Sequence, residues 1–118
     1  MATDLHYPPR NELQLVDVLH ALSDPVRLQM VRQLDHARGS IACGQFSLPV
    51  TKSTRSHHFK VLREAGVVRA QDDGTRRYYT LRRDDLDARF PDLLDTVIRA
   101  AEETALLRAA NPVDDRQA

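Results

Sequence analysis

The spacing of apolar side chains along the chain predicts a protein built mainly from helices. Apolar residues recur at three-residue steps through residues 13–22, so this segment is expected to form a helix with a broad apolar face, buried on two sides. Asp24 is a typical capping residue for a second helix whose first turn accepts Pro25, and this helix should end before Gly39. Two consecutive helices with a short break are therefore predicted.

A further helix is expected over residues 53–65, where Gly66 is placed to end it. Glycines and a proline interrupt the preceding residues 39–51, whose apolar positions predict only a short helical turn. At about 100° per residue, His58 and Phe59 share one side of the helix with other apolar residues, and the opposite side is polar. We expect His58 to be a core histidine with satisfied hydrogen bonds and the polar stripe to face outward.

A hairpin and a long helix should complete the domain. Residues 67–70 and 77–81 are β-prone, and the Asp-Asp-Gly-Thr segment between them suits a tight turn. Because Tyr78 and Tyr79 alternate across the second strand, one is expected to pack inward. Beyond the hairpin, apolar residues at steps of three and four predict a helix over residues 86–105, which Pro91 kinks or restarts.

The length of 118 residues indicates one domain, which we place at residues 11–110. Residues 1–10, with two prolines, are predicted to be a flexible arm, and the polar residues 111–118 a disordered tail. The sequence has no apolar run of the roughly 20 residues that span a membrane and no signal-peptide pattern at its start, so no membrane partner and a cytoplasmic location are expected.

Charge is unevenly distributed although the formal net charge is zero. Residues 50–83 carry nine basic and three acidic side chains, whereas the residues from 84 onward carry four basic and nine acidic ones. A neutral protein with one basic segment is suited to a polyanion such as double-stranded DNA.

Three stretches resemble the signature segments of the ArsR-type (arsenic-repressor-like) transcriptional regulators: LSDPVRL at residues 22–28, STRSHHFKVLREAGVV at 53–68 and GTRRYYTL at 74–81. The resemblance implies a winged helix-turn-helix fold, mainly α with a small β-hairpin, in the order α-α-α-α-β-β-α. It also implies a bacterial homodimeric repressor, not an enzyme, that binds an inverted-repeat operator and is modulated by an effector, which the sequence does not identify.

In such a protein, residues 53–66 form the recognition helix and the 67–81 hairpin forms the wing. Side chains at the start of a recognition helix read base edges, while cations on its flank and on the wing meet phosphates. Arg55 stands where the family commonly has an apolar residue, and we expect it to reach from the first turn into the DNA groove. The predicted DNA contacts are Lys52, Ser53, Thr54, Arg55, Ser56, His57, Lys60, Arg76 and Arg77.

The resemblance also implies that the first and last helices form the dimer interface. Two such helices carry more apolar surface than one small core covers. The predicted interface residues are Leu15, Val18, Leu19, Phe90, Leu94, Val97, Ile98 and Ala101.

The familiar metal sites of the family are missing, so no metal cofactor is expected. Some members use a Cys-x-Cys pair before the recognition helix, where this chain has only Cys43, and others use Asp and His on the terminal helix, which has no histidine here. His57 and His58 point about 100° apart and suit one ion poorly. An unfamiliar site built from His6, His20 and acidic residues of a partner's last helix remains an alternative.

Two alternative functions remain open. Cys43, which we expect to be a packed core residue, is the one side chain with sensor chemistry, so a thiol-based redox-sensing repressor is one alternative. The other is a winged-helix module that binds proteins through its apolar helices without specific DNA binding. Catalysis is not expected, because Cys43 with His57 or His58 is the only nucleophile and base pair available and nothing in the sequence places them together.

Overall fold

The computed structural model describes residues 2–110, and the side chains of residues 2–105. The predicted tail, residues 111–118, lies outside the described residues. The helices are α1 (Leu15–Leu22), α2 (Pro25–Ala37), α3 (Lys52–Glu64), α4 (Arg83–Arg89) and α5 (Leu93–Ala110). The strands are β1 (Ala2–Asp4), β2 (Ile41–Ala42), β3 (Val68–Asp73) and β4 (Arg76–Leu81), with single 3-10 turns at Arg10–Glu12 and Cys43–Gln45.

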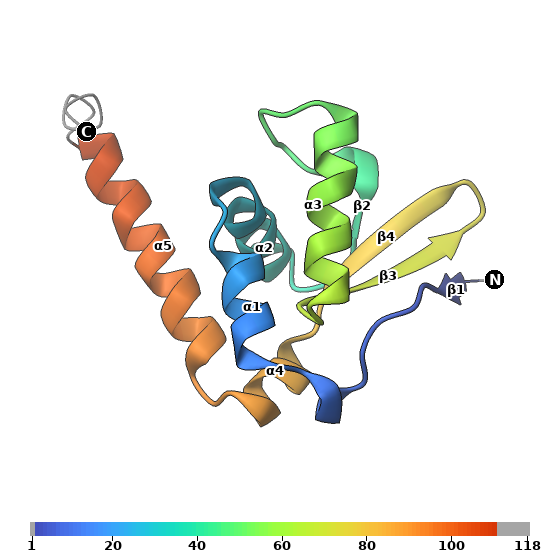
Figure 1. The fold of residues 1–118 in the computed structure, drawn as a ribbon. Coiled ribbons are helices and arrows are strands. Elements are labelled where there is room, and N and C mark those ends of the chain that lie inside the picture. Colours follow the sequence, from blue (N-terminus) through green and yellow to red (C-terminus); the bar gives the residue numbers. More distant parts are fainter. Residues whose placement is uncertain (1, 111–118) are drawn as a thin grey trace.

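The fold class is a winged helix-turn-helix, as the sequence predicts (Figure 1). The β3–β4 hairpin is the wing and extends away from the helices beside α3 (Figure 1). Its turn consists of Gly74 and Thr75, and Gly74 has a φ of 65°, which glycine adopts without strain. The hairpin therefore has the tight turn that its sequence predicts.

The residues predicted to begin α2 and to end α3 have these roles in the structure. The side chain of Asp24 accepts hydrogen bonds from the backbone N–H groups of Val26 at 2.8 Å and Arg27 at 3.1 Å, so it caps α2. After α3 the chain turns at Gly66, with a φ of 87°, and a Cβ built there would lie 2.1 Å from Cδ2 of Leu13. Both the backbone conformation and the lack of space require glycine at this position.

One local feature was not predicted. Residues 39–51 contain the expected short helical turn, as the 3-10 turn, but also strand β2, because Ile41 and Ala42 pair with β4. Helix α2 ends before Gly39, as predicted, and the left-handed residue that ends it is Arg38, with a φ of 54°. The last helix restarts around Pro91, as predicted, which divides it into α4 and α5, and the next residue, Asp92, has a φ of 67°.

The N-terminal segment is held against the wing and does not extend as a free arm. Ala2–Asp4 pairs antiparallel with β3, so the sheet has the strand order β1-β3-β4-β2. The backbone N–H of Leu5 donates to the carbonyl of Ala70 at 2.9 Å. The reason is that an uncovered β3 edge would leave its backbone groups unpaired, and this segment satisfies them.

The core lies between α1, α2, α3, the start of α5 and the inner face of the sheet (Figure 1). Met30, Val31, Leu62 and Val67 are fully buried at its centre. Of the helices in the described part of the chain, none is long and apolar enough to cross a membrane.

Candidate nucleic-acid interface

The first turns of α3 carry the predicted DNA-contacting side chains on an open face. Arg55 is half-buried and the others are exposed: Lys52, Ser53, Thr54, Ser56, His57 and Lys60. Thr51 fixes where this helix begins, because its Oγ1 accepts a hydrogen bond from the backbone N–H of Thr54 at 3.2 Å. Polar side chains on the first turn of an exposed helix have the chemistry needed to read base edges.

A groove of about 900 Å³ separates α3 from the wing. It has six cationic side chains in its walls and one carboxylate, that of Asp72. A surface with this excess of positive charge attracts phosphate. The cations of the groove are Lys52, Arg55, Lys60, Arg63, Arg76 and Arg77.

One predicted phosphate contact, Arg77, is already paired within the wing. Its guanidinium donates two hydrogen bonds to Asp72, at 2.6 and 3.1 Å. This bond lowers the pKa of the Asp72 carboxyl and, together with the hydroxyl of Tyr79, raises the pKa of Arg77. The carboxylate cancels part of the positive charge that Arg77 brings to the groove.

Arg63 belongs to the groove and is missing from the predicted contact set. It follows Ser56 and Lys60 at steps of four and three residues, which places all three on one helix stripe. Its guanidinium donates to the carbonyl of His6 at 2.6 Å, so the N-terminal segment fixes the end of α3 as well as the wing. The helical spacing in the sequence was the signal that could have found this residue.

Arg55 is half-buried and lies between the core and the groove. It lines the groove, yet its Nε atom is buried and has no hydrogen-bond partner among the described residues. An arginine whose donors are only partly satisfied can turn toward an acceptor without breaking an existing bond.

A buried polar cluster holds the inner side of α3, and it confirms His58 as a core histidine. Arg27 and His58 are 7% and 8% exposed. The guanidinium of Arg27 donates to the carbonyls of Ala21, at 2.7 Å, and His20, at 3.2 Å, and lies 3.1 Å from Nδ1 of His58. Asp24 Oδ1 lies 3.8 Å from Nε2 of the same ring. Arg27 therefore links the end of α1 to α3.

The wing and α3 are joined by aromatic rings. Tyr79 is buried, stacks on Phe59 and also contacts Phe46 edge-on, whereas Tyr78 is half-buried. The prediction that one of the two tyrosines packs inward is thus confirmed. Burial raises the pKa of the Tyr79 hydroxyl, although Arg77 acts in the opposite direction.

Cys43 is half-buried in the wall of the groove, where it packs against the core. The rings of His57 and His58 have centroids 5.8 Å apart and tilted planes. No cluster of three or more His, Cys, Asp or Glu side chains suited to a metal ion occurs within residues 2–105.

The residues predicted to form a dimer interface fall into separate groups. Val18, Leu94 and Ile98 are only 1%, 2% and 5% exposed, so they hold the chain's own helices together and offer no surface to a partner. This corrects their assignment, which rested on the resemblance and on apolar periodicity, because neither distinguishes a chain's own core from the surface it offers to a partner. Leu15 and Leu19 are each 44% exposed, and Val16, which was not predicted, is 75% exposed.

The other three predicted interface residues, Phe90, Val97 and Ala101, are half-buried. Val97 and Ala101 line a groove of about 570 Å³ between the start of α2 and α5. This groove and the exposed side of α1 leave apolar surface uncovered in the single chain.

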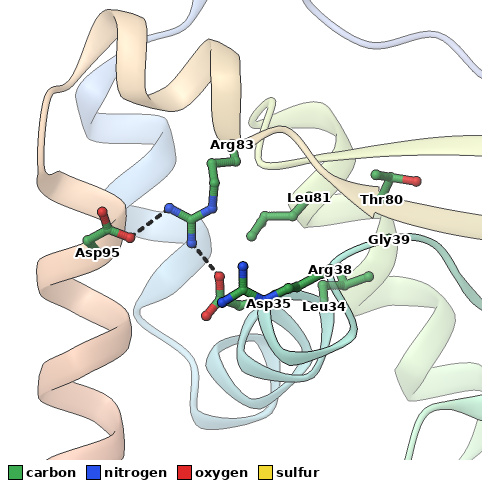
Figure 2. Close-up of a pocket in the computed structure, with 8 residues that line it drawn as sticks. All are labelled: Leu34, Asp35, Arg38, Gly39, Thr80, Leu81, Arg83 and Asp95. Atoms are coloured by element: carbon green, nitrogen blue, oxygen red, sulfur yellow. Dashed lines mark hydrogen bonds and ion pairs between the residues drawn. The ribbon is translucent and has the colours of Figure 1, made fainter.

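A further cavity of about 550 Å³ lies where α2, β4 and the last two helices meet (Figure 2). Figure 2 shows Arg83 of α4 reaching between Asp35 of α2 and Asp95 of α5, and it donates to both, at 2.6 Å in the case of Asp95. Partial burial lowers the pKa of Arg83, but these two carboxylates raise it overall. One guanidinium thus fixes the helices around this cavity.

Comparison with known proteins agrees with this geometry. Residues 22–71 match the helix-turn-helix domain family. The chain is 35% identical over 82 residues to the uncharacterised HTH-type transcriptional regulator YceK of Bacillus subtilis, covering 68% of this chain and 82% of that one. It is 41% identical over 63 residues to the HTH-type transcriptional regulator Rv2034 of Mycobacterium tuberculosis, covering 52% of this chain and 57% of that one.

Solved structures share the fold. HlyU from Vibrio cholerae superposes with a TM-score of 0.59 at 24% identity, covering 72% of this chain and 88% of that one. A possible transcriptional regulator for arsenical resistance superposes with a TM-score of 0.54 at 29% identity, covering 75% of this chain and 82% of that one. With its recognition helix, wing and basic groove, the chain belongs to the ArsR-type winged helix-turn-helix transcriptional regulators.

Proposed function

We propose that the protein is a bacterial homodimeric repressor that binds an inverted-repeat operator through α3 and the wing. The observation that carries the proposal is the groove in which six cations lie beside the exposed polar first turns of α3. Cations there hold the phosphate backbone, while the helix start reads bases. An unidentified small-molecule or protein effector releases the repressor from its operator.

Uncovered apolar surface supports the homodimer. Leu15, Val16 and Leu19 form an exposed apolar patch on α1, and α5 borders a second apolar groove. A second copy that covers these surfaces would place two recognition helices about one DNA turn, roughly 34 Å, apart. Such a dimer reads an inverted repeat, because its two-fold symmetry matches that of the operator.

Selection from a random duplex library, followed by binding of the enriched sequence at two salt concentrations, tests the proposal. We expect an inverted repeat with half-sites one turn apart and an affinity that falls steeply with salt. Recovery of no enriched sequence would instead favour the module that binds proteins without specific DNA contacts. Repression is tested with a reporter gene placed behind the selected operator.

We also propose that operator binding needs no resident metal. The described side chains contain no group of three potential ligands, and the rings of His57 and His58 diverge. Titration of the chelator-treated protein with zinc should leave operator affinity unchanged. A shift that disappears in a His6→Ala, His20→Ala double variant would reveal the alternative site shared with a partner's last helix.

A second candidate function is thiol sensing, which the place of Cys43 in the groove wall favours. Its thiolate would attack one oxygen of hydrogen peroxide, the O–O bond would break, and sulfenic acid and hydroxide would form. The added bulk would lie beside the DNA path. Peroxide should then release the wild type and not Cys43→Ser, whereas equal behaviour of both proteins removes this candidate.

A further inference from the structure

His58 lies between a cation and an anion from the same helix. Its Nδ1 is 3.1 Å from the guanidinium of Arg27, and its Nε2 is 3.8 Å from Oδ1 of Asp24. Both partners come from the first turn of α2 and its cap, whereas His58 belongs to the recognition helix. The ring therefore joins the helix that approaches DNA to the helix packed behind it.

The chemistry of Arg27 fixes the protonation state of His58 in this arrangement. A guanidinium is always charged and only donates hydrogen bonds, so Nδ1 of His58 must accept and carries no proton. The neutral ring then has its proton on Nε2, which points toward the Asp24 carboxylate. A neutral His58 with this tautomer satisfies both contacts.

Protonation would reverse the preference of the ring for its two neighbours. With a proton on Nδ1, two donors would face each other 3.1 Å apart, and two positive charges would be held in a buried position. The same proton would strengthen the attraction between the ring and the carboxylate of Asp24. That carboxylate also caps α2, so it would hold the ring in addition to the backbone N–H groups of Val26 and Arg27. A charged His58 is therefore drawn away from Arg27 and toward Asp24.

The groups around the ring of His58 and the guanidinium of Arg27 come from α1, α2 and α3. Among the described residues, the charged groups placed against the ring are Arg27 and Asp24 of α2, and the titratable ring of His57 is its neighbour on α3. From α1 the cluster receives only backbone carbonyls, those of His20 and Ala21, which bind Arg27.

We propose that His58 is a positioning residue for DNA recognition, which in its neutral form locks α3 to Arg27 and on protonation moves to Asp24 and releases that lock. Protonation of His58 then lowers operator affinity. This inference rests on the proposed DNA-binding function. It adds a response to acid that is built into the contact between α2 and α3.

The key comparison is between the wild type and His58→Asn. The Oδ1 atom of asparagine lies near the position of Nδ1 and accepts a hydrogen bond, yet asparagine cannot be protonated. We expect this variant to bind the selected operator like the wild type at pH 7.5. Between pH 7.5 and 5.5 the affinity of the wild type relative to the variant should fall about tenfold, the effect of losing one hydrogen bond to a charged group.

His57→Asn is the matched control on the same helix. His57 is exposed on the face of α3 that is proposed to meet DNA. A proton on its ring would therefore add positive charge there and strengthen binding, which is the opposite sign. The operator affinity of His57→Asn should therefore fall more steeply with decreasing pH than that of the wild type. An identical pH profile for the wild type and His58→Asn would overturn the proposal, as would a wild-type affinity that rises relative to that variant.

Nitrogen NMR of histidine-labelled protein without DNA tests the lock independently. At pH 7.5 His58 should show a protonated Nε2 and an unprotonated Nδ1, and the side-chain N–H signals of Arg27 should shift as the ring titrates. A proton on Nδ1 at pH 7.5, or Arg27 signals that ignore the titration, would contradict the inference. If NMR shows the expected protonation of His58 but the protein binds no duplex at any pH, the proposed DNA-binding function is wrong. The role of His58 in DNA recognition is then wrong as well.

Discussion

The ring of Tyr79 lies flat on the ring of Phe59, with centroids 3.8 Å apart and planes only 6° from parallel. Tyr79 belongs to strand β4 of the wing and Phe59 to the recognition helix. The two elements proposed to face DNA are thus packed on each other through this aromatic contact, and a change at either ring alters the relation between both surfaces.

Tyr79→Ala should weaken this connection. Loss of a buried aromatic side chain lowers the free energy of unfolding by about 3–5 kcal/mol. Urea unfolding measures this loss, and operator affinity measures the displaced wing. Tyr79→Phe keeps the stacked ring and should retain most of the stability, and Tyr78→Ala, at a half-buried position, should cost less than Tyr79→Ala. Equal losses at positions 78 and 79 would contradict the packing role.

Asp72→Asn should strengthen DNA binding. The change removes the carboxylate from the groove and releases Arg77, so the slope of log affinity against log salt should become steeper by about one unit. Glu103→Gln, which removes a charge from an exposed position of α5, is the control and should leave the slope unchanged. Weaker binding by Asp72→Asn would show that the Asp72–Arg77 ion pair favours DNA binding by stabilising the wing more than it opposes binding by neutralising charge.

Substitutions in α3 should change sequence preference, whereas substitutions in the wing should weaken binding to all sequences. If Arg55 meets a base edge, Arg55→Ala should alter preference at particular base pairs by about 1–3 kcal/mol. Arg76→Ala should weaken all sequences alike and reduce the salt slope by about one unit. Binding to a library of operator variants at two salt concentrations separates the effects. The assignment fails if the wing variant changes sequence preference and the helix variant does not.

Val16→Asp should break the dimer without unfolding the chain. Val16 is 75% exposed, so its replacement by aspartate leaves the core intact while placing charge on the apolar patch of α1. Sedimentation should show a monomer, and circular dichroism should show unchanged helix content. In contrast, Leu94→Asp buries a charge in the core and should unfold the chain. A wild type that is monomeric at micromolar concentration would refute the dimer.

Asp24 should give the fold an acid-sensitive contribution. Burial raises the pKa of the Asp24 carboxyl, but hydrogen bonds from the backbone of Arg27 and Val26 and the nearby charges lower it overall. A lowered carboxyl pKa stabilises the fold above the ordinary value of about 3.9, and this stabilisation is lost as the pH falls through the lowered value.

Replacement separates the charge of Asp24 from its capping role. Asp24→Ala should cost about 0.5–2 kcal/mol at neutral pH, whereas Asp24→Asn keeps the cap and loses only the charge. The difference in unfolding free energy between the wild type and Asp24→Asn should shrink below pH 4 in urea titrations. A difference that stays constant to pH 2.5 would exclude the charge as its source.

Local signals were sufficient to predict much of the fold. Asp24, Gly66 and Gly74 each act through the conformation or hydrogen bonding of their own neighbourhood, so the sequence predicts them without knowledge of distant contacts. His58 was placed in the core by helical periodicity. The exposed residues at the start of α3 followed from the same periodicity, whereas their DNA contacts remain predictions.

The remaining features depend on contacts between distant segments. Arg27 is buried because carbonyls at the end of α1 and a ring on α3 satisfy it, and an arginine in a helix is otherwise expected at the surface. Likewise, a strand of three residues at Ala2–Asp4 exists only because β3 offers an edge. Periodicity identified Val18 and Leu94 as apolar but could not tell whether they face the chain's own core or a partner.

The pairing of β1 with β3 has a practical consequence for anyone who handles the protein. Ala2 lies opposite Asp73, next to the Gly74–Thr75 turn at the tip of the wing. Any purification tag fused ahead of Ala2 would thus emerge at the tip of the wing, where we propose that DNA approaches. A histidine-rich or charged tag there would attract or obstruct DNA in every affinity measurement. Binding studies therefore need the N-terminal fusion removed, because otherwise the tag becomes part of the surface under test.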